Sequence, residues 1–299
     1  MRGEADLLHA GAFANRKIHI VSRLLDVASI MWMYRGKFGR FPNLVAPRTH
    51  TERMQVAKLT WRSPLLPLFV DKVRAKDFVA REFGADLVTP NLHVGDRLPP
   101  RAERNWSVPY VIKVNHASKA NIFVRGEAER DWDAIEPRIE RWLRRTYGKR
   151  MGEWAYSQVP RKVLVEPFLG PLDTTPIEYK ISVFGGRVAT IGVTLDRYGD
   201  RRNAFYDRDW QLLPFTFLPK PGPLAAQPVP QQFERLLAIS EEVGKRMPFV
   251  RVDFMEVEGR PHFSEITVYA NSGMQPLDPP EYDRILGALW GKGKPAQSW

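Results

Sequence analysis

The sequence of 299 residues contains no cysteine. This absence excludes disulfide bonds, thiolate zinc sites and a cysteine nucleophile, and it fits a reducing cytosol. The six histidines show none of the spacings that are typical of metal ligands. Long hydrophobic runs are also missing, because the most apolar stretch, residues 18–34, is interrupted by Arg23 and Asp26. That stretch is too polar to cross a bilayer, and it lacks the cleavage site of a signal peptide. We therefore expect a soluble, cytoplasmic protein.

Positive charge is plentiful, because 45 lysine and arginine residues outnumber 34 acids and give a net charge of +11. Such a surface favours an anionic partner, which charge alone does not identify. Nucleic acid is the least favoured partner, because the basic residues form no base-reading motif. A basic helix is expected over residues 131–147, and its positive side is either a solvated face or a docking surface for an acidic polymer or the inner face of a membrane. Its basic residues are Arg138, Arg141, Arg144 and Arg145, followed by Lys149 and Arg150.

Hydrophobic periodicity predicts helices over residues 16–34, 131–147 and 231–246. Helix-start residues predict two more, over residues 52–59 and over residues 72–82, where Asp71 is the expected N-cap. For the helix over residues 16–34, packing on the core is favoured over an alternative position on a membrane surface. Apolar runs predict strands, most of them joined by short turns, at residues 110–114, 121–124, 162–167, 178–184, 187–195, 249–254 and 263–267. Strands joined in this way favour α+β lobes over a doubly wound sheet. The glycine-rich signatures of Rossmann and P-loop proteins are both absent.

Two strands near the C-terminus carry the most informative residues. The turn at residues 258–261 is short enough to pair them as a hairpin. Asp253 and Glu265 then lie side by side, and two carboxylates at one point repel each other unless a cation or a proton lies between them. Arg251 lies two residues before Asp253, on the same face of its strand. This arrangement predicts a site for Mg²⁺ and a polyphosphate.

Upstream, a lysine interrupts an apolar strand. Lys113 either marks the edge of a sheet or points into a cleft that holds an anion, and we favour the cleft. The small residues Ala117, Ser118 and Ala120 follow His116, where they would let backbone N–H groups approach a phosphate. An ordinary hairpin turn explains the same residues when they are taken alone.

The strand over residues 162–167 ends at a carboxylate, Glu166, which two apolar side chains, Phe168 and Leu169, follow. Such a segment suits the edge of an adenine ring, since ligand pockets are mostly apolar with a few placed polar groups. Glu178 opens the next strand, where it would accept hydrogen bonds from a ribose, and Lys180 follows on the same face.

In this order, these segments resemble the ATP-grasp superfamily, and within it the TupA-like family linked to teichuronopeptide and other cell-surface polysaccharide synthesis. The resemblance extends over residues 38–290. It rests on the segments Asp71-Lys72-Val-Arg-Ala-Lys76, Val111-Ile-Lys113-Val-Asn-His116, Val163-Leu-Val-Glu166-Pro-Phe-Leu169, Arg251-Val-Asp253 and Glu265-Ile-Thr267.

The resemblance implies an α+β, ATP-grasp fold in which two lobes bind ATP between them, preceded by an N-terminal helical extension. It divides the chain into the extension (residues 1–60), the N-terminal part of the grasp (61–108), a subdomain with the phosphate hairpin and basic helix (109–170), and a C-terminal subdomain with the metal site (171–299).

The resemblance also implies roles for individual residues. Arg251 and Lys113 would act in catalysis, Asp253, Glu265 and Thr267 would bind Mg²⁺, and Ser272 with Gly273 would contact the acceptor. The residues implied in ATP binding are Lys72, Lys113, His116, Ser118, Glu166, Phe168, Leu169, Glu178 and Lys180.

The implied reaction is an ATP-dependent ligation of a carboxylate to an amine or amino acid through an acyl phosphate. A uronic acid or an acidic cell-surface polysaccharide would supply the carboxylate. Two other functions stay open, namely a kinase that phosphorylates a sugar hydroxyl and a binding module for acidic glycans without catalytic activity. We expect the protein in the cytoplasm, with a peripheral position at the membrane as one possibility for residues 1–40.

Overall fold

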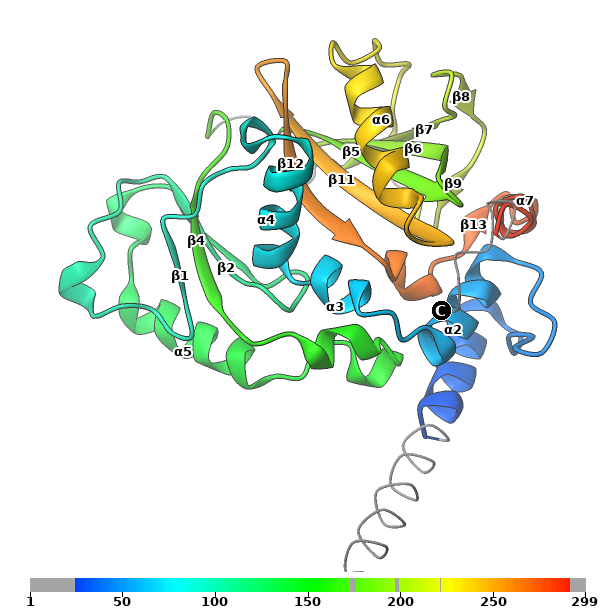
Figure 1. Cartoon of the computed structure of the whole chain (residues 1–299), viewed down its shortest axis with the longest axis horizontal. Coiled ribbons are helices and arrows are strands. Elements are labelled where there is room, and N and C mark those ends of the chain that lie inside the picture. The colour runs from blue at the N-terminus through cyan, green and yellow to red at the C-terminus, as the bar shows by residue number, and fades with distance from the viewer. Residues whose placement is uncertain (1–24, 173–175, 197–198, 221, 291–299) are drawn as a thin grey trace, which may run out of the picture.

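A computed structural model describes residues 25–172, 176–196, 199–220 and 222–290 of the chain. Within these residues the fold combines helices with antiparallel sheets, as the sequence predicts (Figure 1). Residues 25–38 are helical, and Ile20 and Leu24 of the first expected helix lie outside the described part. Among the described residues, no helix combines the length and the apolar character that a membrane crossing requires.

A four-stranded antiparallel sheet has the order β1-β4-β2-β3. Its strands are β1 (His93–Gly95), β2 (Tyr110–Val114), β3 (Asn121–Val124) and β4 (Val163–Pro167). The basic helix α5 (Trp132–Arg144) packs against it, because Ile135 and Ile139 join the core of buried strand residues (Figure 1). This helix ends three residues before the expected end, since Arg145 adopts an extended conformation with ψ 129°.

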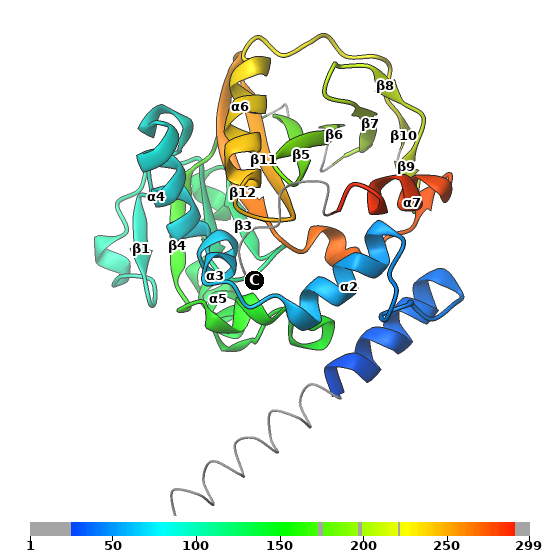
Figure 2. The same ribbon diagram turned by 45° about the vertical axis from the view of Figure 1, so that its right-hand side comes forward.

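A seven-stranded sheet holds the larger core of the protein. Along its main path the order is β10-β7-β6-β5-β11-β12, and β8 pairs with β7. The strands are β5 (Ile177–Phe184), β6 (Arg187–Leu195), β7 (Arg202–Tyr206), β8 (Leu212–Leu213), β10 (Gly222–Pro223), β11 (Phe249–Val257) and β12 (Arg260–Thr267). Helix α6 (Phe233–Gly244) covers one face of this sheet, as Figure 2 shows. A separate pair of short strands joins β9 (Thr216–Phe217) to β13 (Leu277–Asp278).

Three helices connect the N-terminal part of the chain to the site. They are α2 (His50–Thr60), α3 (Leu65–Val70) and α4 (Lys72–Phe83). Asp71 caps α4 as its sequence suggests, since its side chain accepts hydrogen bonds from the backbone N–H groups of Val73 and Arg74. Helix α4 contacts β12 of the large sheet, and its first residue, Lys72, lies 3.8 Å from Glu265 on that strand. Short 3₁₀ segments include η5 (Trp154–Gln158) and η6 (Ala270–Gly273).

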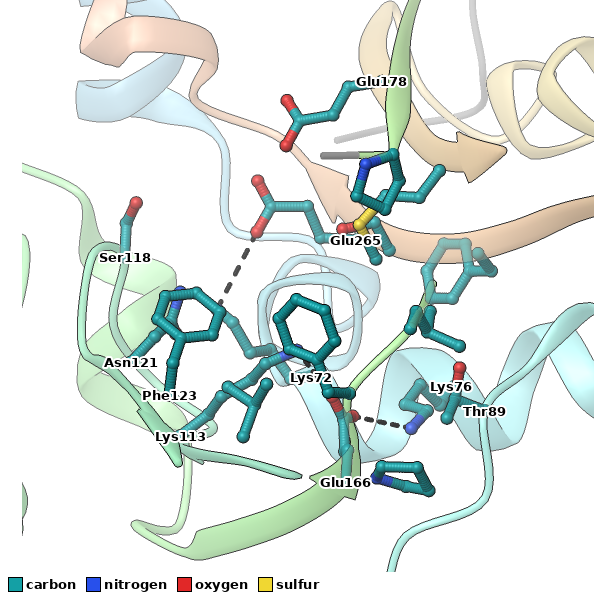
Figure 3. A pocket seen from close by; sticks show the side chains of 18 of the residues that line it. Lys72, Lys76, Thr89, Lys113, Ser118, Asn121, Phe123, Glu166, Glu178 and Glu265 are labelled. Carbon is teal, nitrogen blue, oxygen red and sulfur yellow. Dashed lines mark hydrogen bonds and ion pairs between the residues drawn. The ribbon is translucent and has the colours of Figure 1, made fainter. Parts of the chain in front are cut away.

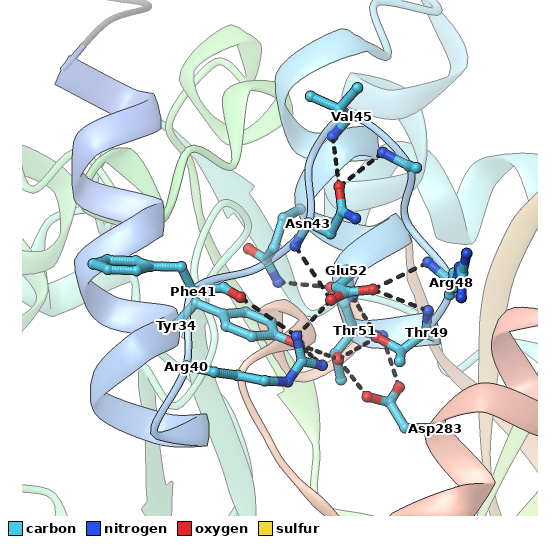
Figure 4. A network of polar contacts seen from close by, with 12 residues as sticks. Tyr34, Arg40, Phe41, Asn43, Val45, Arg48, Thr49, Thr51, Glu52 and Asp283 are labelled. Atoms are coloured by element: carbon cyan, nitrogen blue, oxygen red, sulfur yellow. Dashed lines mark hydrogen bonds and ion pairs between the residues drawn. The ribbon is translucent and has the colours of Figure 1, made fainter.

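Helix α2 also contacts the last described helix, α7 (Glu281–Gly287). Thr51 donates hydrogen bonds to Asp283 from its backbone N–H (2.8 Å) and its hydroxyl (2.5 Å), as Figure 4 shows. The two backbones approach so closely that a Cβ on Gly287 would lie 2.2 Å from the carbonyl oxygen of Arg48. Helix α2 is therefore packed closely against α7, which lies near the end of the described residues.

Candidate functional site

One pocket lies between the two large sheets and the start of α4 (Figure 3). It encloses about 1150 Å³ of space free of protein atoms, its open mouth included. Strands β2, β3 and β4 line it from one side, and β5, β11 and β12 line it from the other. The predicted residues that it brings together are Lys72, Lys113, Ser118, Glu166, Phe168, Leu169, Glu178 and Glu265.

Glu166 holds two lysines at the base of the pocket. Its Oε1 accepts a hydrogen bond from Lys76 Nζ at 2.6 Å, and its Oε2 accepts one from Lys113 Nζ at 2.5 Å. Burial opposes the ionisation of this carboxyl group, but the two ammonium groups outweigh it and lower the pKa of Glu166 to about 2. Lys76 also donates to Asn91 Oδ1 at 3.0 Å. The carboxylate thus fixes both ammonium groups beside the cavity.

Lys72, the first residue of α4, connects the two sides of the pocket. Its Nζ donates to the carbonyl oxygen of Ala117 at 2.8 Å and lies 3.8 Å from Glu265 Oε2. Burial lowers the pKa of Lys72, while the nearby Glu265 raises it in part. An ammonium group in this position is well placed to exchange these contacts for a phosphate oxygen.

The C-terminal hairpin forms in the predicted register. Asp253 on β11 and Glu265 on β12 are direct cross-strand partners. Arg251 binds Asp253 through two hydrogen bonds of 2.6 Å, and its Nη2 lies 3.6 Å from Glu265 Oε1. The Thr267 hydroxyl donates to Glu265 Oε1 at 3.2 Å. Burial raises the pKa of Asp253, and Arg251 offsets this rise in part. The sequence pattern therefore located a cluster of two acids and one guanidinium correctly.

The donor chemistry of this hairpin fits a magnesium ion. Two carboxylates and one hydroxyl offer only hard oxygen ligands, and Mg²⁺ is usually held by one or two carboxylates together with water and substrate phosphates. A magnesium site formed by protein groups alone would need more oxygen ligands than these three. No group of three or more His, Cys, Asp or Glu side chains suited to a metal occurs within the described residues.

Glu178 and Lys180 lie on β5, next to β11. Glu178 lines the pocket, and Lys180 Nζ donates a hydrogen bond to its Oε2. Lys180 is the cross-strand partner of Asp253, and burial lowers its pKa although Glu178 and Asp253 act in the opposite direction. Glu178 thus lies across the pocket from Glu166, with Glu265 between them in Figure 3. Lys180 therefore contacts Glu178 but does not itself line the pocket.

Other predicted site residues lie outside the pocket lining, where the structure gives them different contacts. The His116 side chain is buried with its Nδ1 3.3 Å from Asn115 Oδ1, and burial lowers its pKa. Ser272 Oγ accepts from Lys58 Nζ at 3.1 Å, and the Gly273 carbonyl accepts from Gln55 Nε2 at 2.8 Å. Ser272 and Gly273 therefore pack η6 against α2, and their contact with an acceptor stays a prediction.

Several pocket residues have no role in the predictions from sequence. Lys76 lies one turn after Lys72 on α4, and this spacing of four residues could have identified it. Phe263 lies two residues before Glu265 on β12, and a register shift separates them, since Glu265 pairs with Asp253 and Phe263 pairs with Phe254. Met255 and Phe123 add apolar walls, and Thr89 lies near Lys76 in Figure 3. No sequence signal distinguishes these three from ordinary core or loop residues.

Comparison with known proteins adds an independent observation. A profile of the family described as TupA-like ATPgrasp matches residues 52–290. The comparison with curated proteins found no match.

Solved structures similar to this chain include several ligases. D-alanine–D-alanine ligase from Helicobacter pylori is 16% identical with a TM-score of 0.37, and the match covers 75% of this chain and 57% of that chain. The D-alanine–D-alanine ligase from Bacillus anthracis is 16% identical with a TM-score of 0.42, over 77% and 67% of the two chains. L-amino acid ligase from Bacillus licheniformis is 15% identical with a TM-score of 0.40, over 81% and 53%. The chain thus spans between about half and two thirds of the length of these structures.

Proposed function

The chain belongs to the TupA-like ATP-grasp family, whose profile matches residues 52–290, and from this premise we propose that it is an ATP- and Mg²⁺-dependent carboxylate–amine ligase. One observation carries the proposal: the pocket that is lined by the two lysines held by Glu166 is also lined by Glu265, the cross-strand partner of Asp253. Phosphoryl transfer depends on positioning and on neutralising phosphate charge rather than on covalent help from the protein. Ammonium groups on one side and a hairpin with acids and a guanidinium on the other supply these two requirements.

The nucleotide would lie along the pocket from the apolar to the charged end. Phe168 and Leu169 with the buried Phe263 form apolar walls for an adenine ring. Glu178 would accept hydrogen bonds from the ribose, since its carboxylate lines the same pocket. Lys72 and Lys113 would then bind phosphate oxygens. The hydrogen bond to Glu166 positions the Lys113 ammonium group for this role.

Asp253, Glu265 and the Thr267 hydroxyl would hold Mg²⁺. When bound, the ion neutralises phosphate charge and aligns the γ-phosphoryl group for transfer. Arg251 lies between these two acids, so its guanidinium is close to the charge that develops during transfer. Arg251 and Lys113 are the residues to which we assign catalytic roles.

The reaction follows in two steps. An oxygen of the acceptor carboxylate attacks the γ-phosphorus, the bond to the β-phosphate oxygen breaks, and ADP leaves with the bonding electrons. The acyl phosphate then reacts with an amine, which forms a carbon–nitrogen bond, releases inorganic phosphate and loses a proton. We propose that the carboxylate belongs to a uronic acid or an acidic polysaccharide.

The basic helix α5 supports this class of acceptor. The side chains of Arg138, Arg141, Arg144 and Arg145 are exposed along it. Only part of this charge is balanced locally, since Arg144 lies 3.4 Å from Glu140 and Arg138 stacks 5.5 Å from the Trp142 ring. A row of arginines near the phosphate hairpin suits a polyanionic chain.

We also propose that the chain divides into an N-terminal extension and three parts of the ATP-grasp fold, with boundaries at residues 60, 108 and 170.

Calorimetry of ATP binding in the presence of Mg²⁺ tests the site. We expect wild type to bind ATP and the double variant Asp253→Asn/Glu265→Gln to lose Mg²⁺-dependent binding. The control Asp209→Asn/Glu234→Gln removes the same two charges at exposed positions away from the pocket. Equal binding by both double variants would overturn the assignment of the metal-binding acids.

A screen of uronic acids with amines for ADP release then tests the reaction. A ligase releases inorganic phosphate and an amide, whereas a kinase leaves phosphate on the acceptor. If wild type binds an acidic glycan but neither ATP nor amine, the protein is a glycan-binding module instead.

A further inference from the structure

The N-terminal helix leaves large apolar side chains exposed on one side. Leu25 and Trp32 are each 65% exposed and are separated by two helical turns, so they lie on one face. Phe41 follows the helix at 42% exposure, and its ring packs edge-to-face on Trp32 with 5.6 Å between the centroids. The opposite face is covered, because Ile30 and Tyr34 are fully buried and pack with Met274. The core of the described residues therefore buries one face of this helix and leaves the face with Leu25 and Trp32 exposed.

Basic residues outnumber acids near this apolar face, although Arg40 is paired with Glu52 at 2.6 Å. From residue 27 to residue 51 the sequence holds Arg35, Lys37, Arg40 and Arg48 but no Asp or Glu. The Arg35 guanidinium lies 5.6 Å from the Trp32 ring and 5.1 Å from the Phe41 ring, so charge and aromatic surface are one unit. We call the set of Leu25, Trp32, Arg35 and Phe41 the Trp32 surface, and the exposed Lys37 lies near its end of the helix.

The loop that carries part of this surface is held in one shape, as Figure 4 shows. Glu52 accepts hydrogen bonds from Arg40 Nη1 (2.6 Å) and from the backbone N–H groups of Asn43, Arg48 and Thr49. The Asn43 side chain accepts from the N–H groups of Val45 (3.2 Å) and Ala46 (2.8 Å). This turn leaves the Val45 side chain 97% exposed at its tip. The loop thus fixes the position of Phe41, which packs on Trp32 of the helix.

We propose that the Trp32 surface docks the protein on an anionic phospholipid bilayer, which goes beyond the ligase activity proposed above. Tryptophan and phenylalanine prefer the boundary between headgroups and acyl chains, and basic side chains beside them bind anionic headgroups. A second copy of the chain fits less well. A symmetric contact would bring Arg35 and Lys37 of both copies together with no acid from residues 27–51 between them.

Co-sedimentation of the full chain with vesicles tests this proposal. The vesicles contain phosphatidylcholine alone or about three parts phosphatidylcholine to one part phosphatidylglycerol. We expect binding to the anionic vesicles only, and a binding constant at least about tenfold lower for Trp32→Ala/Phe41→Ala, because two interfacial aromatics are lost. Arg35→Glu/Lys37→Glu should also lower binding and weaken its dependence on salt.

The control variant Leu212→Ala/Ile285→Ala removes exposed apolar side chains elsewhere, at 56% and 50% exposure, and should bind as wild type does. Thermal unfolding of each variant checks that it folds. No binding by wild type, or equal binding by Trp32→Ala/Phe41→Ala, overturns the proposal. Light scattering that shows a dimer which this variant dissociates, without vesicle binding, assigns the surface to a second copy and also overturns it. None of these outcomes depends on ATP, so the ligase proposal stands or falls separately.

Discussion

Replacing Glu166 with glutamine should destabilise the protein strongly, because the substitution leaves two ammonium groups without their carboxylate. The Glu166 and Lys76 side chains are only 10% and 7% exposed, so water replaces little of the lost interaction. The difference between the ordinary glutamate pKa of 4.5 and the value of about 2 corresponds to about 3 kcal/mol. Burial also lowers the pKa of Lys76, which means that part of this energy offsets desolvation of the ammonium group. We therefore expect the free energy of unfolding to fall by about 2 to 3 kcal/mol.

Urea denaturation followed by tryptophan fluorescence measures this change. The pH dependence provides a second test. Because the pKa of Glu166 is lower in the folded than in the unfolded protein, its contribution is complete above pH 4.5 and is lost as the pH falls from 4.5 toward about 2. The difference in stability between wild type and Glu166→Gln should narrow over that range.

A matched variant distinguishes charge from packing. Glu166→Gln/Lys76→Met removes the buried ammonium group together with the carboxylate, so it should be more stable than Glu166→Gln alone. A Glu166→Gln protein as stable as wild type would refute the reasoning. A double variant whose loss in free energy of unfolding equals the sum of the losses in Glu166→Gln and Lys76→Met would also refute it.

Two further substitutions, at His50 and Gly273, test the packing around helix α2. His50 is buried, its Nδ1 accepts a hydrogen bond from Trp290 Nε1 at 3.0 Å, and burial lowers its pKa from 6.5 to about 4. Its contribution of about 3 kcal/mol should be complete above pH 6.5 and lost as the pH falls through 4, and urea titrations of His50→Gln should lack this dependence. Gly273→Ala should lower the free energy of unfolding by about 2 kcal/mol, because φ is +59° and the new Cβ would lie 2.6 Å from the Met54 Cβ. In thermal unfolding the control Gly36→Ala, which meets no atom within 4 Å, should not destabilise the protein, and equal effects of the two substitutions would contradict this account.

Local sequence patterns predicted those parts of the site that depend on neighbours along the chain. Strand alternation and a short turn were enough to place Asp253 and Glu265 on one hairpin, whereas their direct pairing depends on a register shift between Asp253 and Phe254 that these patterns do not predict. The helix cap at Asp71 was equally local, because an N-cap side chain bonds to the next two or three N–H groups. Both predictions required no knowledge of the rest of the fold.

Contacts between distant segments could not be predicted in this way. Lys76 and Glu166 are 90 residues apart, and nothing in either segment indicates that the ammonium group of one meets the carboxylate of the other. The hydrogen bond that Lys58 donates to Ser272 joins residues 214 apart, and no local pattern indicated it. Periodicity tells which side chains share a face, whereas the partner of that face follows only from the packing of whole elements.

The contact between α2 and α7 has a consequence for the order in which the protein folds during synthesis. Thr51 and Asp283 are 232 residues apart, and His50 binds Trp290 from 240 residues away. At a synthesis rate of about 5 to 20 residues per second, roughly ten to fifty seconds pass between the two segments leaving the ribosome. During that time the buried polar groups at the start of α2 have no partner from the C-terminal part of the chain. Helix α2 therefore acquires this part of its native surroundings only after the C-terminal segment has been made.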